Sequence, residues 1–303
     1  MPLFSILIPV YNRGKLITET IDSVLNQSYN DFEIIVVDDG SSDDSLEVLK
    51  GYGDKIVLLQ QKNSGPEVAR NLAAANAKGE YFVFLDSDDL LLEWALETYA
   101  KIISKFDQPA LVLGKLFAYR NENELLSLSK IKTPIEVVVY DDYLKKDRKN
   151  WSSSSIIVVK KKVFFDAGGL RNSTPNTFHI DDHNFLMRTC NYGPMILVEH
   201  PFTVLYRLHG TNSIHNLQLI INGVQRLKSA EINGEYPGGS SRKFERMASI
   251  GGPFFGWALT MLNNNHYLLA AELFFSGLPM IIANILRKIN LKISGVKQSI
   301  TIE

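Results

Sequence analysis

Cysteine is almost absent from this sequence of 303 residues, since Cys190 is the only one. No disulfide can therefore form within the chain, which is typical of a reducing compartment. We expect Cys190 to be a small buried residue rather than a nucleophile. The sequence also lacks an excess of either positive or negative charge, because the formal net charge is only -1. The missing basic excess argues against a nucleic-acid partner.

A secretory signal peptide is also missing from the pattern. The apolar run Phe4 to Val10 begins almost at Met1, with no basic segment before it and no small-residue cleavage site after it. We therefore expect a cytoplasmic protein. The sequence contains no internal repeats, and its hydrophobic content of 45% and charged content of 21% are ordinary for a globular protein.

The first hundred or so residues alternate between apolar strands and helices. We expect strands at about residues 4–10, 32–38, 55–61 and 81–85, with a helix in each interval. In the third helix, Pro66 suits the first turn and Gly79 the C-terminal cap. Because the strands are continuously apolar, the alternation predicts a mostly parallel, Rossmann-like α/β sheet that is flanked by helices.

Beyond Leu90 the alternation loosens. We expect a strand and a short helix in "SSSSIIVVKKKVFFDAGGL", a helix in "DDHNFLMRTCNYG" and two short strands in "MILVEHPFTVLYRLHG". From about Asn216 the pattern becomes helical. The predicted domains are residues 1–215, which divide at about residue 105, and a helical C-terminal extension at 216–303.

The extension contains the longest apolar segment, Tyr267 to Leu286. Glu272 and Pro279 interrupt it, which argues against a membrane-spanning helix. Basic residues follow it, namely Arg287, Lys288, Lys292 and Lys297. Two interpretations remain: a peripheral element on the anionic inner face of the cell membrane, or helices that pack on the catalytic domain.

Acidic residues follow the predicted strands. In "EYFVFLDSDDLL", Asp86 and Asp88 come directly after a buried strand, where alternation would put them on the same side. Ligands of parallel α/β sheets bind outside the carboxyl ends of the strands, and two convergent carboxylates suit Mg²⁺ or Mn²⁺ that also holds phosphates. The alternatives are a solvated turn and, for Asp89, a cap of the helix that follows.

Six blocks give this pattern a specific context. They are "SILIPVYNR", "TIDSVLNQSYNDFEIIVVDDGSSDDS", "NSGPEVARNLAAANAKGEYFVFLDSDD", "VFFDAGGL", "DDHNFLMR" and "YRLHGTNS", and they cover roughly the first 213 residues. In this order they resemble the family 2 glycosyltransferases with the GT-A fold, of the type that builds bacterial cell-surface polysaccharides.

The resemblance implies a nucleotide-binding part at about residues 1–105 and an acceptor part at about 106–215. It also implies a nucleotide-sugar donor, which the family holds at matching positions. Pro9 and Tyr11 lie where the nucleobase and ribose are cradled. Asp39 matches the carboxylate that accepts from the base, with Asp38 beside it. Arg70 matches an arginine near the nucleotide, and its alternative is a charge on the helix surface.

The resemblance also implies a divalent metal cofactor, Mn²⁺ or Mg²⁺. Asp86 matches a position toward ribose and metal, and Asp88 a ligand of the metal itself. His209 matches a histidine near the diphosphate or metal, with Arg207 and Ser213 as weaker candidates. A divalent ion would neutralise the charge that develops on the leaving diphosphate.

In this family the catalytic base belongs to an acidic pair before a helix, usually Glu-Asp. Aligned through Arg188, the base is Asp182, and Asp181 takes the place of the Glu. The alternative is that both acids merely stabilise the positive end of the helix. Upstream, Gly168 and Gly169 would allow an acceptor to approach closely.

These features predict an inverting, metal-dependent hexosyltransferase that uses a nucleotide-sugar donor, UDP-linked, and a glycan or lipid-linked acceptor. A non-catalytic nucleotide-sugar-binding protein on the same fold is the alternative. A nucleotidyltransferase would need a Gly-rich basic loop, which "VYNRGKL" is not. The missing Gln-x-x-Arg-Trp block of processive synthases favours transfer of one sugar per acceptor.

Overall fold

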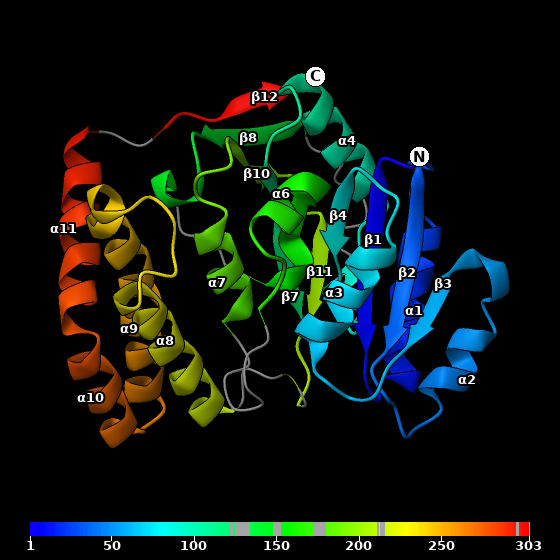
Figure 1. The fold of residues 1–303 in the computed structure, drawn as a ribbon, viewed down its shortest axis with the longest axis horizontal. Coiled ribbons are helices and arrows are strands. Elements are labelled where there is room, and N and C mark those ends of the chain that lie inside the picture. The colour runs from blue at the N-terminus through cyan, green and yellow to red at the C-terminus, as the bar shows by residue number, and fades with distance from the viewer. Residues whose placement is uncertain are drawn as a thin grey trace.

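In the computed structural model, the fold is built on one large mixed sheet with a helical layer at one end (Figure 1). The structure describes residues 1–121, 124, 134–147, 153–171, 180–210, 212, 216–294 and 297–302.

Within these residues, the main sheet has the strand order β12-β8-β10-β6-β9-β4-β1-β2-β3. Its strands are β1 (Phe4–Val10), β2 (Phe32–Asp38), β3 (Val57–Gln60), β4 (Tyr81–Phe84), β6 (Leu111–Leu113), β8 (Ile135–Tyr140), β9 (Ile157–Lys160), β10 (Met195–His200) and β12 (Ile300–Ile302). Only β8 and β9 run against the common direction. The sheet is therefore mostly parallel, as predicted, and β1 is buried along its whole length because helices cover both faces.

A second, small sheet brings a late segment of the chain back to the end of β4. It consists of β5 (Leu90–Leu91), β11 (Val204–Arg207) and β7 (Leu116–Tyr119), in that order. β11 pairs antiparallel with β5, so that Val204 lies opposite Leu91 and Leu205 opposite Leu90. Because β11 runs backward past β5, its last residue and the loop after it arrive beside the Asp86–Asp89 segment.

The helices of the first 190 residues agree with the predicted pattern. They are α1 (Gly14–Leu25), α2 (Ser45–Lys50), α3 (Pro66–Asn76), α4 (Ala95–Lys105), α6 (Lys161–Asp166) and α7 (Asp181–Arg188). Short 3-10 turns are η1 (Gly53–Lys55), η2 (Tyr143–Lys145), η3 (Ser154–Ile156) and η5 (Ser240–Arg242).

Helix α3 tests the predicted start and stop signals. Pro66 is its first residue, as expected, but Gly79 is not its cap, since the helix ends at Asn76 and Ala77 follows as the C-cap. A Cβ at Gly79 would stand 2.6 Å from the carbonyl carbon of Phe4. Gly79 is therefore required because the chain passes close to β1, and not because the helix ends there.

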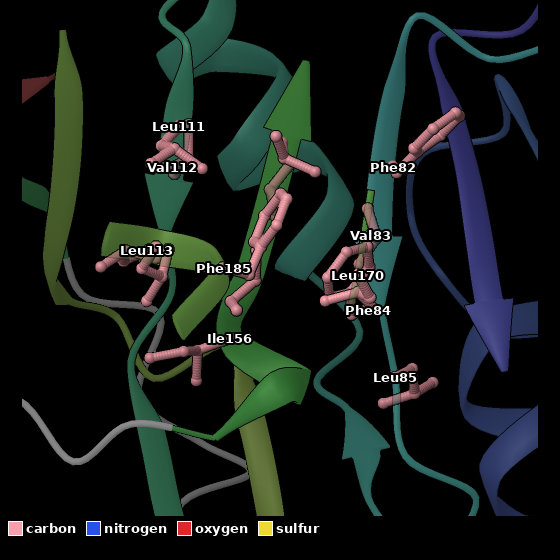
Figure 2. Packing of buried hydrophobic residues seen from close by; sticks show 14 of the residues in the cluster. Phe82, Val83, Phe84, Leu85, Leu111, Val112, Leu113, Ile156, Leu170 and Phe185 are labelled. Atoms are coloured by element: carbon pink, nitrogen blue, oxygen red, sulfur yellow. The ribbon is translucent and has the colours of Figure 1, made fainter. Parts of the chain in front are cut away.

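An aromatic cluster fastens α6 and α7 to β4 (Figure 2). The ring of Phe84 on β4 lies 6.0 Å from Phe164 of α6 and 5.9 Å from Phe185 of α7, and these two rings are 5.6 Å apart. Phe82 joins Phe164 at 5.3 Å. Such pairs stabilise by about 0.5–1.5 kcal/mol each beyond their buried area. The cluster fixes the start of α7 near the carboxyl end of β4.

The C-terminal extension forms the layer at the end of the molecule opposite β3 (Figure 1). Its helices are α8 (Leu217–Ile232), α9 (Lys243–Asn263), α10 (Tyr267–Ser276) and α11 (Leu278–Ser294). The chain then returns to the main sheet as β12, which pairs antiparallel with β8. The sequence did not predict this strand, because three residues are too few for a periodic signal.

Helices α9 and α11 cross at a glycine. A Cβ at Gly251 would stand 1.9 Å from the backbone oxygen of Met280. The two backbones therefore come closer than any other residue type at this position would allow.

Replacing this glycine tests the crossing. We expect Gly251→Ala to destabilise the protein by about 1–3 kcal/mol, because α9 and α11 must move apart. Gly256→Ala is the matched control on the same helix: Gly256 is exposed, with no atom within 4 Å of an added Cβ, and alanine there should stabilise by about 0.5–1 kcal/mol. Thermal unfolding of both variants measures the difference, and equal melting temperatures would contradict the close crossing.

Candidate active site

The predicted nucleotide residues lie at the carboxyl ends of β1 and β2. Pro9 is buried within β1 opposite Val37, whereas Tyr11 lies just beyond the strand and is 46% exposed. A backbone with positive φ at Asn12 then turns the chain into α1. Tyr11 is therefore available to a ligand, while Pro9 shapes the strand end beneath it.

Asp39 joins β2 to the segment before α3. Its Oδ1 accepts from Gln61 Nε2 at 2.7 Å and from the Ser64 amide at 2.8 Å, and its Oδ2 accepts from the Gly65 amide at 2.9 Å. A carboxylate has about four acceptor positions, so about one remains for a donor such as a nucleobase N–H. Asp38 is also buried, and its Oδ1 accepts from the Ser41 amide at 3.2 Å.

Arg70 and Asp86 form a partly buried ion pair between α3 and the end of β4. The guanidinium also lies over the ring of Phe84, with 5.9 Å from Cζ to the centroid. Arg70 is only 5% exposed, so it is not a surface charge of α3. Burial raises the pKa of Asp86, and the charge of Arg70 opposes that shift. The site thus holds one cation and one carboxylate in direct contact.

Asp88 is contacted by side chains from two distant segments, the residue before α1 and the end of β11 with the loop after it. Its Oδ2 lies 3.1 Å from His209 Nε2 and 3.4 Å from Arg13 Nε. Arg207 of β11 donates to the Asp88 backbone oxygen at 3.2 Å and pairs with Glu19 of α1 at 2.6 Å. Two of the residues predicted to hold a metal, Asp88 and His209, are therefore brought together, while Ser213 lies outside the described residues.

Asp89 is not the cap of the helix that follows, because α4 begins only at Ala95 with Trp94 before it. Its carboxylate is fully buried and accepts from Ser155 Oγ at 2.6 Å and from the Arg207 amide at 3.1 Å. Burial, with the charges of Asp86 and Asp88, raises the pKa of Asp89 well above its ordinary value. Asp89 therefore ties the acidic turn to β11.

Ser155 is a site residue that the sequence analysis did not single out. Its oxygen accepts from the Asp86 amide at 3.1 Å while its hydroxyl donates to Asp89. The available signal was the serine run before β9, but four consecutive serines give no indication of which one is buried. The turn itself is closed by the Asp89 amide, which donates to the Asp86 carbonyl at 3.1 Å.

The two acids at the start of α7 have different surroundings. The charge of Asp86 raises the pKa of Asp182 and that of Arg70 lowers it, so both lie close enough to act on it. Asp181 instead acts on Arg188 and Arg226. Asp182, the predicted base, thus lies beside the acidic turn that follows β4, whereas Asp181 lies toward α8. Both acids are also in the first turn, where the helix dipole favours them.

Burial raises the pKa of Asp182 from 3.8 to about 6. Its Oδ1 accepts from the His183 amide at 2.6 Å, which opposes the rise. A carboxylate with a pKa near 6 is a stronger proton acceptor than an ordinary one and is still ionised at neutral pH. Asp182 can therefore take a proton from a bound hydroxyl.

The Gly168–Gly169 turn is held from two sides. Leu170 exchanges two hydrogen bonds with the Asn71 amide of α3, at 2.6 and 2.9 Å, and Arg188 donates to the Ala167 carbonyl. Both glycines have positive φ, and a Cβ at Gly169 would stand 2.8 Å from Asn71 Oδ1. The glycines are thus needed for the turn and for the contact with Asn71.

A divalent metal fits part of this arrangement. Within the described residues, no group of three His, Cys, Asp or Glu side chains is placed to hold a metal ion. Asp88 and His209 offer two adjacent donors, and Asp86 is tied to Arg70. A metal here would need further oxygen ligands, which a diphosphate and water supply for hard cations.

Several curated proteins resemble the N-terminal part of the chain. An uncharacterised glycosyltransferase of Rickettsia typhi is 43% identical over 112 residues, 37% of this chain and 35% of that protein. Glycosyltransferase GlyG of Streptococcus pneumoniae is 36% identical over 39% of this chain and 40% of its own length. A poly(ribitol-phosphate) beta-glucosyltransferase of Bacillus spizizenii is 42% identical over 43% of this chain and 22% of its own length. The matches thus span well under half of these relatives.

Solved structures show the same fold. S. aureus TarS 1-349, in complex with UDP-GlcNAc, superposes with a TM-score of 0.68 at 18% identity, covering 92% of this chain and 81% of that one. The mannosyltransferase PcManGT of Pyrobaculum calidifontis, in complex with GDP-Man and Mn²⁺, gives a TM-score of 0.54 at 15% identity. The match covers 95% of this chain and 87% of that one. At these identities the likeness concerns the GT-A fold alone.

The family is identified by the sequence. The model of the family described as "Glycosyl transferase family 2" matches residues 5–189, which contain the acidic turn, the Gly168–Gly169 turn and the Asp181–Asp182 pair. This is more than half of the chain, and it includes every predicted site residue except His209 and the weaker candidates Arg207 and Ser213. The chain belongs to glycosyl transferase family 2.

Proposed function

We propose that the chain is an inverting, metal-dependent glycosyltransferase that moves a sugar from a UDP-linked donor to a glycan or lipid-linked acceptor of a cell-surface polysaccharide. The observation that carries this proposal is Asp182, a carboxylate with a pKa of about 6 beside the Arg70–Asp86 pair and the acidic turn. A binding protein without catalytic activity would have no use for a raised pKa at this position.

The proposed reaction is a single displacement. The acceptor hydroxyl attacks the anomeric carbon while Asp182 takes its proton, and the bond between that carbon and the diphosphate oxygen breaks, so that UDP leaves with the electron pair. One attack from the opposite side inverts the anomeric centre. Asp182 suits this step because its ionised form is destabilised by burial, so that gaining a proton relieves a cost.

The donor would lie over the carboxyl ends of β1, β2 and β4. The remaining acceptor position of Asp39 suits a uracil N–H, and the exposed ring of Tyr11 suits the nucleoside. TarS, solved with UDP-GlcNAc, supports a UDP-linked donor. The poly(ribitol-phosphate) beta-glucosyltransferase supports a polymeric acceptor. Within this chain, Arg70 would orient Asp86 toward the ribose side of the site.

Asp88 and His209 would hold the metal, with Mn²⁺ in PcManGT as the supporting precedent. When bound, the ion would neutralise the negative charge that develops on the leaving diphosphate. Arg13, 3.4 Å from Asp88, is a protein cation that would act on the same charge.

We further propose that the enzyme works at the inner face of the cell membrane through α10 and α11. Their exposed apolar side chains are Tyr267, Leu268, Phe275, Leu278, Ile282, Ile285, Leu286 and Ile289. Lys288 is exposed among them and suits an anionic surface. In the described chain, no helix alone has the length and hydropathy to cross a membrane, although α10 and α11 to Leu291 would together, with a bend of 75°. A peripheral contact is therefore proposed.

The base is tested by Asp182→Asn. Turnover should fall by about a hundredfold or more, the usual scale for a lost general base, while UDP affinity stays nearly unchanged. The wild-type rate should fall with acid below a pH of about 6, as Asp182 becomes protonated. At pH 7 Asp182 is ionised, and its raised pKa means that this ionisation lowers the stability of the folded protein. Replacing it with the neutral Asn should therefore not lower the melting temperature at pH 7.

Asp181→Asn is the control for this assignment. It removes the adjacent carboxylate, whose charge acts on Arg188 and Arg226 instead. We expect it to keep most of the turnover. If Asp181→Asn is the damaging change, or if Asp182→Asn loses UDP affinity as well, the roles of the two acids are wrong.

The metal is tested by Asp88→Asn. The variant should lose transfer and bind UDP more weakly in Mn²⁺, because one carboxylate ligand is gone. A panel of nucleotide sugars, scored for Mn²⁺-dependent hydrolysis by the wild type, supplies the donor for the assay. Full turnover by Asp88→Asn, or by the wild type in chelator, would reject the metal-dependent mechanism.

Liposome co-sedimentation tests the membrane contact. Leu268 is 88% exposed, so Leu268→Glu should leave the fold intact and shift the chain from the anionic-lipid pellet to the supernatant. Val57→Glu is the control, because Val57 is 42% exposed on β3 at the opposite end of the molecule. Equal sedimentation of the wild type and Leu268→Glu would reject the membrane contact and leave α10 and α11 as helices that only pack on the rest of the protein.

A further inference from the structure

A second group of polar residues lies beside the start of α7, on the segment that follows β8. Tyr143 Oη lies 3.0 Å from His183 Nδ1, next in sequence to the base. Lys146 Nζ lies over the ring of Tyr143, 5.3 Å from its centroid. The charge of Asp182 acts on both Tyr143 and Lys146. The segment 142–147 therefore presents a lysine near the catalytic base.

The C-terminal extension holds this segment in place. Arg287 of α11 donates to the carbonyl oxygens of Leu144 and Lys146, the latter at 2.7 Å. Arg242, just before α9, pairs with Asp142 at 3.0 Å, and Lys145 pairs with Glu245 of α9 at 2.5 Å. Three residues of the extension, Arg287, Arg242 and Glu245, thus hold the segment that carries Lys146.

Two cations in this group lack a carboxylate partner among the residues that the structure describes. Lys146 and Arg287 are partly buried, yet neither forms an ion pair with a described carboxylate, whereas their neighbours Lys145 and Arg242 both do. Burial, and then the charge of Arg287, lowers the pKa of Lys146 to about 8. Nearby carboxylates act on both cations, Asp182 on Lys146 and Glu245 on Arg287, but none forms an ion pair with either. Two like charges in a partly buried site are costly, and an anion in direct contact would relieve that cost.

His183 adds a polar atom without a partner. The side chain is only 8% exposed, and its Nε2 is buried with no hydrogen bond among the described residues. Burial, and then the charge of Lys146, lowers its pKa to about 3, so the ring is neutral. Depending on the tautomer, Nε2 offers either a donor or an acceptor to a ligand.

We propose that Lys146, supported by Arg287, binds a phosphate group of the acceptor beside Asp182. This inference rests on the proposed function and names the acceptor class: a hydroxyl compound that also carries a phosphate ester or diphosphate. Cations matched to a phosphate bind it through several charge-assisted hydrogen bonds. The phosphate would orient the acceptor so that its hydroxyl meets Asp182.

The charges assign this site to the acceptor rather than to the donor. Asp86 and Asp88, the donor-side carboxylates, act on Tyr206 and Asp89 but not appreciably on Lys146. Asp182 acts on Lys146 and also responds to Asp86. The base therefore links the two groups, as a displacement requires: its carboxylate has to face the hydroxyl that attacks the donor.

The test is a calorimetric titration of the full chain with glycerol 3-phosphate, with UDP and Mn²⁺ saturating the donor site. We expect the wild type to bind glycerol 3-phosphate and not glycerol, and Lys146→Gln to bind it about tenfold to a hundredfold more weakly. Lys162→Gln is the control, since this exposed lysine of α6 is paired with Asp166 and does not contact the segment 142–147. It should bind like the wild type.

Two further arms distinguish the source of the phosphate. Binding of the diester glycerophosphoglycerol, weakened by Lys146→Gln, assigns a polyol-phosphate chain. Recruitment to phosphatidylcholine vesicles that contain a polyprenyl diphosphate, weakened in the same way, assigns a lipid-linked acceptor.

Unchanged phosphate binding by Lys146→Gln, or equal binding of glycerol and glycerol 3-phosphate, would overturn the inference. So would a loss of UDP affinity in Lys146→Gln, which would move Lys146 to the donor site. Failure of the proposed function is distinguishable, because it appears as a wild type that does not bind UDP in Mn²⁺.

Discussion

The aromatic contact of Phe84 with Phe164 and Phe185 is the constraint on which the rest of the site depends. Phe84 lies two residues before Asp86, and Phe185 three residues after Asp182. When these rings pack, the end of β4 and the start of α7 have almost no freedom relative to each other. Two carboxylates almost a hundred residues apart are thereby brought within electrostatic reach. Apolar packing thus sets the geometry of the polar chemistry.

Around this cluster, buried acids are stabilised by partners from distant elements. Arg70 reaches Asp86 from α3, Ser155 reaches Asp89 from η3, and the amide of Arg207 reaches Asp89 from β11. Since an unpaired carboxylate is costly away from water, each partner contributes to keeping the acidic turn folded. Asp182 lacks an ion pair among the described residues and keeps a raised pKa. The residue with the least compensation is the one suited to accept a proton.

The C-terminal extension is integrated with the catalytic part rather than appended to it. Arg287 fastens the segment that carries Tyr143 and Lys146, and β12 returns to the edge of the main sheet beside β8. The same helices that expose an apolar face to solvent therefore also position residues near Asp182. A change in how α9 and α11 pack would reach the acceptor side of the site through these contacts.

The sequence alone determined the strands β1 to β4 and β9 to β11, the helices α3 and α7, the acidic turn and the Asp181–Asp182 pair, because periodicity and local motifs record them directly. The tertiary structure decided what each charge meets. It made Arg70 a buried partner of Asp86, turned Asp89 away from a capping role, and recruited Ser155. It also joined Arg287 to the Lys146 carbonyl across 141 residues. Such contacts leave no local pattern, because they form only when distant segments pack on the shared core.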